Sequence, residues 1–256
     1  MRWLLTAALL LTPVAGVRGT AEAIDFYEIQ IYGVDTTPEQ HLTLELHSNT
    51  VSTATGRLAH EQIRPYEIHE TIEATYGLTR HIEVGQYFAT AKLDNGNYEY
   101  AGSRTKVHFG LIDPETWPFG VGGNVELDYM RHAAEDQPFT LEMRPILARH
   151  WERWWVAANF AFEKPFSGSG THRGVTFAPS GMVTYDLVAW ISPSVEYYGD
   201  MGPIRSLPGV QRQQHFIVPA ANLHIFQALE LNLGVGFGVT RASNGVFLKS
   251  IVGWTF

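Results

Sequence analysis

The chain has 256 residues, a net charge of −8 and no cysteine. A negative surface argues against nucleic acid as a partner, since binding its phosphates requires a basic face. Without cysteine, neither disulfides nor thiolate metal sites can hold the fold together, which suits an exported protein that folds without covalent cross-links. No composition shift or Pro/Ser-rich linker divides the chain, so we expect one large domain.

The first 23 residues (1–23) have the pattern of a secretory signal peptide. Arg2 precedes the short apolar stretch Trp3–Leu11, and Ala21-Glu22-Ala23 matches an A-x-A cleavage site. The alternative is a short anchor helix or a buried helix, but the apolar run is too short to cross a bilayer. We expect cleavage and a mature chain that starts near Ile24.

Most of the remaining chain shows a period of two residues. Residues 229–239 place an apolar side chain at every second position, with Glu230, Asn232 and glycines between them. Such alternation predicts a strand with one apolar face and one polar or small face. Twelve segments of this kind are expected near residues 40–50, 65–76, 81–92, 100–112, 120–131, 139–149, 154–163, 173–184, 188–199, 213–223, 229–240 and 247–256.

Alternation alone does not say which face points inward, and three features favour a membrane barrel over a soluble one. The last strand alternates through Leu248, Val252 and Trp254 to Phe256, similar to the terminal strand that the outer-membrane barrel assembly machinery reads. We take Trp254 and Phe256 as that assembly signal.

The lengths of the connections are the second feature. Short connections at 77–80, 151–153 and 185–187 alternate with longer polar ones at 52–64, 93–97, 164–172 and 200–212. Short periplasmic turns and longer external loops are typical of membrane barrels. The third feature is a group of aromatic residues near the predicted periplasmic strand ends, where amphipathic rings meet the membrane interface: Trp151, Trp154, Trp155, Trp190, Trp254 and Phe256.

We therefore expect an all-β fold, an antiparallel transmembrane β-barrel of about twelve strands over residues 39–256, surrounded by outer-membrane lipid. Residues 24–38 remain as a separate N-terminal segment. Because its first part also alternates, it is either an extra periplasmic strand or a plug inside the barrel.

Two stretches resemble a known family. Leu44-Glu45-Leu46-His47 followed by Asn49, and Tyr76 to Gly85, are similar to the opening hairpins of outer-membrane transporters labelled by the phenol-degradation (MetA) pathway. The family's usual turn carries an acidic residue where this chain has Arg80. The resemblance extends loosely over the mature chain and implies the barrel fold. It also implies small-molecule transport, with an aromatic or apolar cargo suggested by the label alone.

Charged side chains gather on the register that we expect to face inward. They are Arg104, Lys106, His108, Glu126, Asp128, Glu142 and Arg144. We expect Lys106 to face Glu126 and Arg104 to face Asp128, with Arg144 on the other side of Glu126. Opposite charges on neighbouring strands stabilise by ~0.2–1 kcal/mol each. These residues are our candidates for lining a permeation path, or for a ladder that keeps a narrow interior closed.

Two carboxylates, Glu73 and Glu83, are expected to face each other near the periplasmic mouth. Such a pair can bind a cation or share a proton, although neutralisation by Arg80, His81 and water is the simpler reading. Glu70 falls on the lipid-facing register, where a bulge or a position near the interface would reduce its cost.

Three functions remain open. The chain is a pore or transporter for small molecules, a surface-binding or structural barrel with a plugged lumen, or a lipid-acting enzyme. For the enzyme, His47 and Ser48 are adjacent on a strand and therefore point to opposite faces, so we expect no catalytic site. No tight metal-binding spacing or phosphate loop occurs in the sequence, and we expect neither a metal nor a cofactor.

Overall fold

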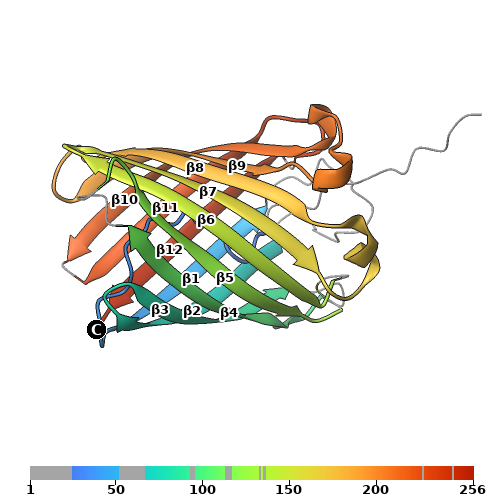
Figure 1. Ribbon diagram of the computed structural model, residues 1–256, viewed down its shortest axis with the longest axis horizontal. Helices are drawn as coiled ribbons and strands as arrows, with labels where there is room; N and C mark the ends of the chain where they lie inside the picture. The colour runs from blue at the N-terminus through green and yellow to red at the C-terminus, as the bar shows by residue number, and fades with distance from the viewer. Residues whose placement is uncertain are drawn as a thin grey trace, which may run out of the picture.

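A computed structural model describes residues 25–51, 67–92, 96–112, 117–132, 134, 137–226, 228–243 and 245–256. In this part of the chain the strands close into one antiparallel barrel in sequence order, from β1 to β12 (Figure 1). The expected fold class is thereby confirmed. The predicted signal peptide lies outside the described residues. No helix in the described part is long and apolar enough to span a membrane.

Each expected strand is found, with ends within a few residues of the expected ones. The strands are β1 Leu42–Val51, β2 Glu67–Thr79, β3 Ile82–Lys92, β4 Tyr98–Ile112, β5 Gly120–Met130, β6 Phe139–Trp151, β7 Trp154–Pro165, β8 Thr176–Tyr185, β9 Ile191–Asp200, β10 Gln214–Phe226, β11 Leu229–Gly238 and β12 Val246–Thr255. Short 3-10 turns are η1 Ser169–Arg173, η2 Ile204–Ser206 and η3 Val210–Arg212.

The barrel closes where the first strand pairs with the last. Thr43 lies opposite Thr255, and Val51 lies opposite Phe247, so the ladder is continuous along both strands. Closure leaves no open sheet edge and pairs every strand with two neighbours, which a membrane-spanning sheet requires.

The two ends of the barrel differ. One end, here called the turn end, carries the start of β1, the end of β12 and tight connections such as 80–81 and 152–153. The opposite end, here called the loop end, carries the connections 166–175 and 201–213, which contain the three 3-10 turns. Two connections depart from this division. The link from β3 to β4 at the loop end spans only residues 93–97, whereas the link from β4 to β5 at the turn end spans 113–119.

The faces of the barrel are apolar outside and polar inside. Leu127 and Met143 point outward and are each 54% exposed, whereas Lys106 is 2% and Glu126 is 0% exposed on the inner face. A soluble barrel has the opposite arrangement, so these strands have the distribution of a membrane barrel. The outward Glu70 lies opposite Thr90, where the β3–β4 register shifts, and its carboxylate accepts a hydrogen bond from the Tyr98 hydroxyl at 2.6 Å.

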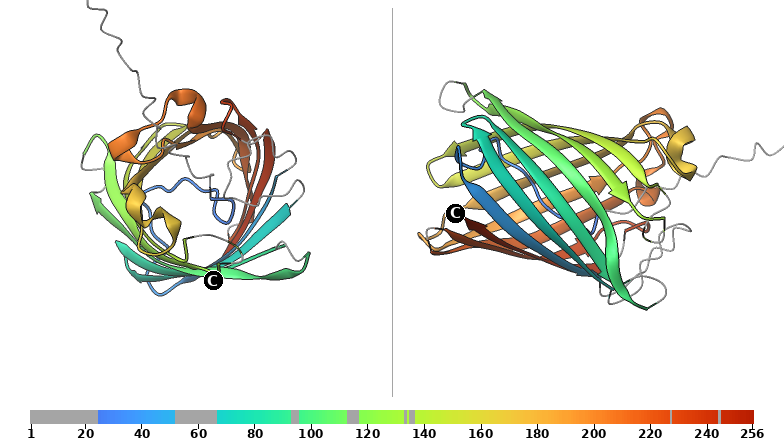
Figure 2. Two further views of the ribbon diagram at one scale, coloured as in Figure 1. Left: turned by 90° about the vertical axis from the view of Figure 1, so that its right-hand side faces the viewer. Right: turned by 90° about the horizontal axis from the view of Figure 1, so that it is seen from below.

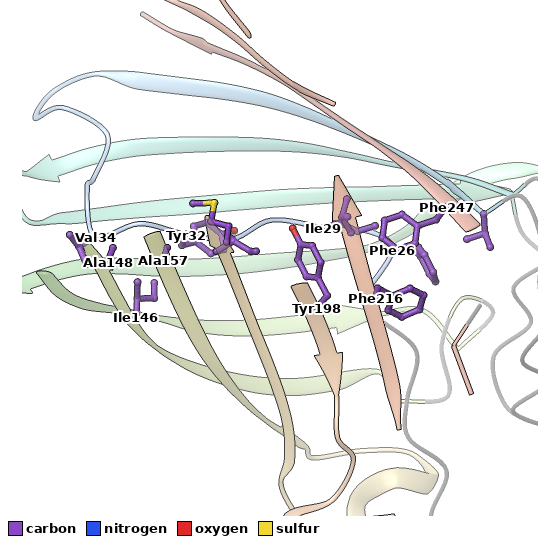
Figure 3. Close-up of a cluster of buried hydrophobic side chains, with 14 residues drawn as sticks. Phe26, Ile29, Tyr32, Val34, Ile146, Ala148, Ala157, Tyr198, Phe216 and Phe247 are labelled. Carbon is purple, nitrogen blue, oxygen red and sulfur yellow. The ribbon is translucent and has the colours of Figure 1, made fainter. Parts of the chain in front are cut away.

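The N-terminal segment, residues 25–38, runs inside the barrel (Figure 2, left). Phe26 contacts Phe247 near the loop end of β12, and Thr37 lies against Glu83 of β3 near the turn end. The buried apolar core forms between this segment and the inner wall (Figure 3). Its members are Phe26, Ile29, Ile31, Tyr32 and Val34 of the segment, and Val51, Ile146, Ala148, Ala157, Met182, Tyr198, Phe216, Val218 and Phe247 of the wall.

Candidate functional site

The charged inner wall forms between neighbouring strands β4 and β5. Arg104 lies directly opposite Asp128, and Lys106 lies directly opposite Glu126, so the expected cross-strand register is confirmed. Residues two apart on a strand share a face, which places all four side chains in the interior. The side chains, however, form contacts that the register alone does not show.

Lys106 reaches across β3 to the carboxylates of the predicted periplasmic mouth. Its ammonium donates to Glu73 Oε1 at 2.7 Å and lies 3.7 Å from Glu83 Oε1. Gly85, opposite Lys106 on β3, makes the reach possible because a Cβ there would lie 3.1 Å from Lys106 Cε. Glu73 and Glu83 are not opposite each other, since Glu73 faces Tyr87 and Glu83 faces Gly77. The expectation that the two carboxylates face each other was wrong, because the β2–β3 register places them opposite other residues, and Lys106 lies near both.

The position expected for Arg144 was also wrong, by two residues along β5. Arg144 lies opposite Asn124, and the residue directly across from Glu126 is Glu142. Arg144 instead donates twice to Glu142 on its own strand, at 2.6 and 2.9 Å. The like charges of Glu126 and Glu142 are therefore neutralised by residues that lie beside them, and not by residues directly opposite them.

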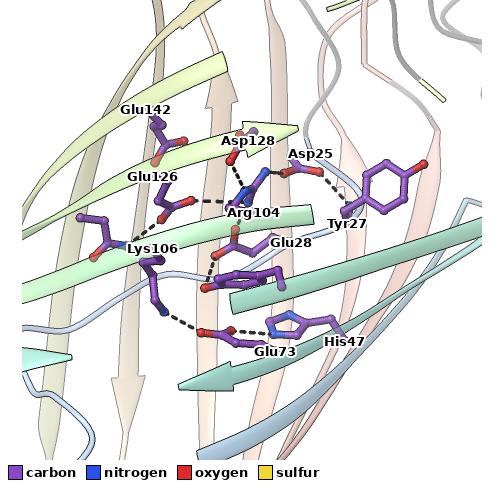
Figure 4. A network of polar contacts seen from close by, with 12 residues as sticks. Asp25, Tyr27, Glu28, His47, Glu73, Arg104, Lys106, Glu126, Asp128 and Glu142 are labelled. Atoms are coloured by element: carbon purple, nitrogen blue, oxygen red, sulfur yellow. Dashed lines mark hydrogen bonds and ion pairs between the residues drawn. The ribbon is translucent and has the colours of Figure 1, made fainter. Parts of the chain in front are cut away.

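Arg104 is the centre of the network in Figure 4. Its guanidinium donates to Asp25 at 2.5 Å, to Asp128 at 2.6 Å and to Glu28, and it lies 3.5 Å from Glu126. Two of these carboxylates belong to the N-terminal segment and two belong to the wall. A planar guanidinium with five N–H donors can satisfy several carboxylates at once. Arg104 thus ties the segment to the wall by charge.

The segment's backbone is held by side chains rather than by a strand partner. Asn159 of β7 accepts from Tyr32 N at 2.8 Å and donates to Tyr32 O at 2.9 Å. Asn49 donates to Phe26 O at 2.8 Å, and Lys249 donates to Ile29 O at 3.1 Å. Buried backbone groups need such partners, because an unpaired one costs free energy.

The ring of Tyr32 lies close to two cations of the wall. Lys106 Nζ lies 4.5 Å from the ring centroid, and Arg144 Cζ lies 5.2 Å from it. The Tyr32 hydroxyl donates to Glu28 and lies 2.9 Å from the Tyr87 hydroxyl. These contacts make Tyr32 the residue through which the segment meets both the charged and the apolar wall.

The segment is anchored again at the turn end. Thr37 N donates to Glu83 Oε2 at 2.5 Å, and Gln40 N donates to Gly77 O at 2.9 Å. Gly77 is required there, because a Cβ would lie 2.2 Å from Pro38 O. His108, another predicted lumen residue, bonds the Asn124 side chain and places Nε2 3.1 Å from the carbonyl oxygen of Asp35.

A further buried ion pair lies outside the predicted group of charges. Lys249 of β12 donates to Glu196 of β9 at 2.6 Å and to the Tyr198 hydroxyl at 3.1 Å. The sequence pattern did not predict this pair or Asn159, and Asn49 was named only within the family motif. All four polar residues sit on inward registers, so alternation could have flagged them. Their partners could not be found, because strands distant in sequence meet only across the filled interior.

The residues of the enzyme alternative and of the aromatic group are placed as follows. His47 is buried inside, whereas Ser48 lies on the opposite face of β1, as the alternation predicts. Trp254 and Phe256 lie at the turn end and are exposed. Trp155 differs from the other tryptophans of its group because it packs inward against the apolar core, beside Gly33.

Comparison with known proteins identifies the fold and leaves the family open. No protein-family model matches the chain, and no curated protein matches it in sequence. The phenol-degradation family is therefore not shown.

Solved structures match over most of the chain. The COG4313 outer membrane channel from Pseudomonas putida F1 is 12% identical, with a TM-score of 0.61 over 90% of this chain and 100% of that one. The KdgM porin is 8% identical, with a TM-score of 0.57 over 84% and 99% of the two chains. The NanC porin is 9% identical, with a TM-score of 0.55 over 83% and 98%. The chain thus has the twelve-stranded closed β-barrel fold found in outer-membrane porins and channels.

Proposed function

We propose that this protein is an outer-membrane pore or transporter for small molecules, whose path is filled by residues 25–38 in the state described here. The observation that carries the proposal is the position of that segment, which runs along the interior from Phe26 to Thr37. Conduction then requires the segment to shift or leave.

The contacts of the segment suit a part that can be displaced. It has no long backbone ladder with a strand, and side chains such as Asn159 and Asn49 supply most of the partners for its backbone. Its carboxylates meet Arg104, which retains Asp128 and Glu126 as wall partners when the segment leaves. The wall therefore keeps paired charges in both states, which limits the cost of leaving a buried charge alone.

The emptied interior would have two chemically different sides. The side formed by β4, β5 and β6 carries Arg104, Glu126 and Arg144, whereas Phe216 and Phe247 lie on a more apolar side that also holds the Lys249–Glu196 pair. A small solute with both a charged group and an apolar body fits such a path better than a purely apolar one. The structural neighbours include a KdgM porin in complex with a disordered oligogalacturonate, an interaction that belongs to that protein.

Three further parts complete the proposal. The chain is exported through a cleaved signal peptide, and outer-membrane lipid surrounds the barrel. The barrel assembly machinery recognises Trp254 and Phe256. The apolar outer face supports outer-membrane lipid as the surroundings of the barrel. The exposed position of both aromatic residues at the turn end is compatible with their being read during assembly.

The second candidate is a structural or surface-binding barrel, and the large buried contact between segment and wall favours it. The two functions differ in one measurement, the single-channel conductance of protein refolded in a planar bilayer. We would compare the mature chain with a variant that lacks residues 25–36 and keeps Pro38 and Gln40 at the turn end.

For a pore, the mature chain should give small or intermittent current steps, and the deletion variant should give larger and steady ones. A variant that is folded and inserted yet carries no current would overturn the pore and support the structural barrel. Heat-modifiable migration on a gel shows that both proteins are folded. In the deletion background, Glu126→Gln should lower cation preference if Glu126 lines the path.

A further inference from the structure

Glu45, His47 and Glu73 form a compact group on the inner face of β1 and β2. Glu45 and His47 are two residues apart on β1, and Glu73 lies directly opposite Glu45 on β2. One donor atom from each residue lies within 4.8 Å of the others. None of the three is used by the proposed pore mechanism.

The spacing of the donor atoms is that of ligands around a metal ion. His47 Nε2 lies 3.3 Å from Glu73 Oε2 and 3.6 Å from Glu45 Oε2. Ligands at two corners of a zinc tetrahedron, with bonds of ~2.0–2.1 Å, lie about 3.3–3.4 Å apart. The contact between His47 and Glu73 is also a hydrogen bond, longer than the ~2.9–3.0 Å that is typical of N–H···O bonds.

The charges also favour a cation between them. Two carboxylates directly opposite on neighbouring strands repel each other. Lys106 neutralises Glu73 through Oε1 and leaves Oε2 facing His47. Among the ion pairs of the described residues, Glu45 has His47 as its partner. An ion bound between the two strands would balance Glu45 and retain the lysine on Glu73.

The surrounding residues orient the group and leave access to it. Thr75 Oγ1 and Lys106 Nζ both donate to Glu73 Oε1 at 2.7 Å, which fixes the direction of Oε2. Gly253 lies opposite Glu45 on β12, and a Cβ there would lie 3.2 Å from Glu45 Oε1. The Glu45 side chain is 22% exposed, so the group is accessible to an ion and its water.

We propose that Glu45, His47 and Glu73 bind one divalent transition-metal ion of the Zn²⁺ class. His47 supplies Nε2, each glutamate supplies Oε2, and a water takes the fourth position. One imidazole and two carboxylates are a donor set that Zn²⁺ uses in proteins. The ion cross-links β1 to β2 near the turn end, independently of whether the barrel conducts.

The test is a titration of refolded, untagged mature protein with Co²⁺, followed by competition with Zn²⁺. Tetrahedral Co²⁺ has visible absorption that reports its ligands, and the metal content of the protein gives the stoichiometry. The variants are His47→Gln and Glu45→Gln. The matched control is His224→Gln, which removes an exposed histidine 3.7 Å from Glu230.

We expect one ion per chain, displacement by Zn²⁺, and at least ~10-fold weaker binding in both site variants but not in the control. Glu45→Gln keeps the size of a partly exposed side chain, so it tests the site even if His47→Gln fails to fold. Absence of Co²⁺ binding by folded wild-type protein would overturn the proposal. Equal binding by wild type and the folded Glu45→Gln variant would overturn it as well.

Discussion

Arg104 is a single side chain on which the charged interior depends. It contacts two carboxylates of the N-terminal segment, Asp25 and Glu28, and two of the wall, Glu126 and Asp128. Its side chain is 15% exposed, so most of this charge is withdrawn from bulk water. Removing one partner from a buried charge pair usually costs more than the pair contributes, because the remaining charges stay unpaired.

Arg104→Gln should therefore loosen the segment before it loosens the barrel. Loss of the cation leaves four acidic groups near one another, and breaking a buried pair costs about 3–5 kcal/mol. We expect more frequent channel opening in planar bilayers and faster proteolysis of residues 25–38. The control is Arg131→Gln, which removes a more exposed arginine paired with Glu99. Conductance and proteolysis equal to wild type in the Arg104 variant would contradict the role of Arg104 in holding the N-terminal segment against the wall.

At the scale of elements, the N-terminal segment is the part that does not behave as a strand. Its alternation allowed either an extra strand or a plug, and the described residues 25–38 lie inside the barrel without joining the sheet. Asn159 supplies both a donor and an acceptor to Tyr32, as a neighbouring strand would. The side-chain amide of Asn159 therefore takes the place of the backbone hydrogen bonds that a neighbouring strand would make.

Asn159→Ala removes both of these hydrogen bonds. Leaving a buried N–H or C=O unsatisfied costs about 1–3 kcal/mol each, so the Tyr32 amide should exchange its hydrogen at least ~10-fold faster. Hydrogen exchange with mass spectrometry of the peptide 25–38 measures this change. Asn222→Ala is the matched control, because Asn222 bonds Asn232 on β11 and not the segment. Similar protection of the segment in both variants would show that Asn159 does not hold it.

At the scale of the whole molecule, the outer face determines where the barrel can reside. Exposed side chains such as Leu127, Met143 and Leu233 cover this face, and the charged network around Arg104 and Lys106 lies inside. In water, so much exposed apolar surface would favour association. In a bilayer it is matched to its surroundings.

Leu127→Arg tests this face directly. On the lipid side near the bilayer midplane, an arginine costs about 2–4 kcal/mol, so the variant should unfold from lipid vesicles at lower urea concentration. Ile204→Arg is the control, since Ile204 is similarly exposed but lies in η2 at the loop end. Equal destabilisation by the two substitutions, or none by either, would contradict a membrane position for the middle of β5.

The sequence by itself determined the strands, their number and the register between β4 and β5, but not the register of β5 with β6. These features follow from the period of two along each strand, which is a local pattern. It also indicated the inward charges, because the side that a residue faces depends on its position within its own strand. The pairing of Arg104 with Asp128 was predictable for this reason.

Only the tertiary structure decided what those charges contact. Lys106 passes over Gly85 to Glu73, Arg104 meets Glu28, and Asn159 meets Tyr32. Each contact depends on closure of the barrel and on the segment inside it, which bring together residues that no local pattern connects. Closure depends on the tilt and stagger of all twelve strands at once, so the interior partners are a property of the complete barrel.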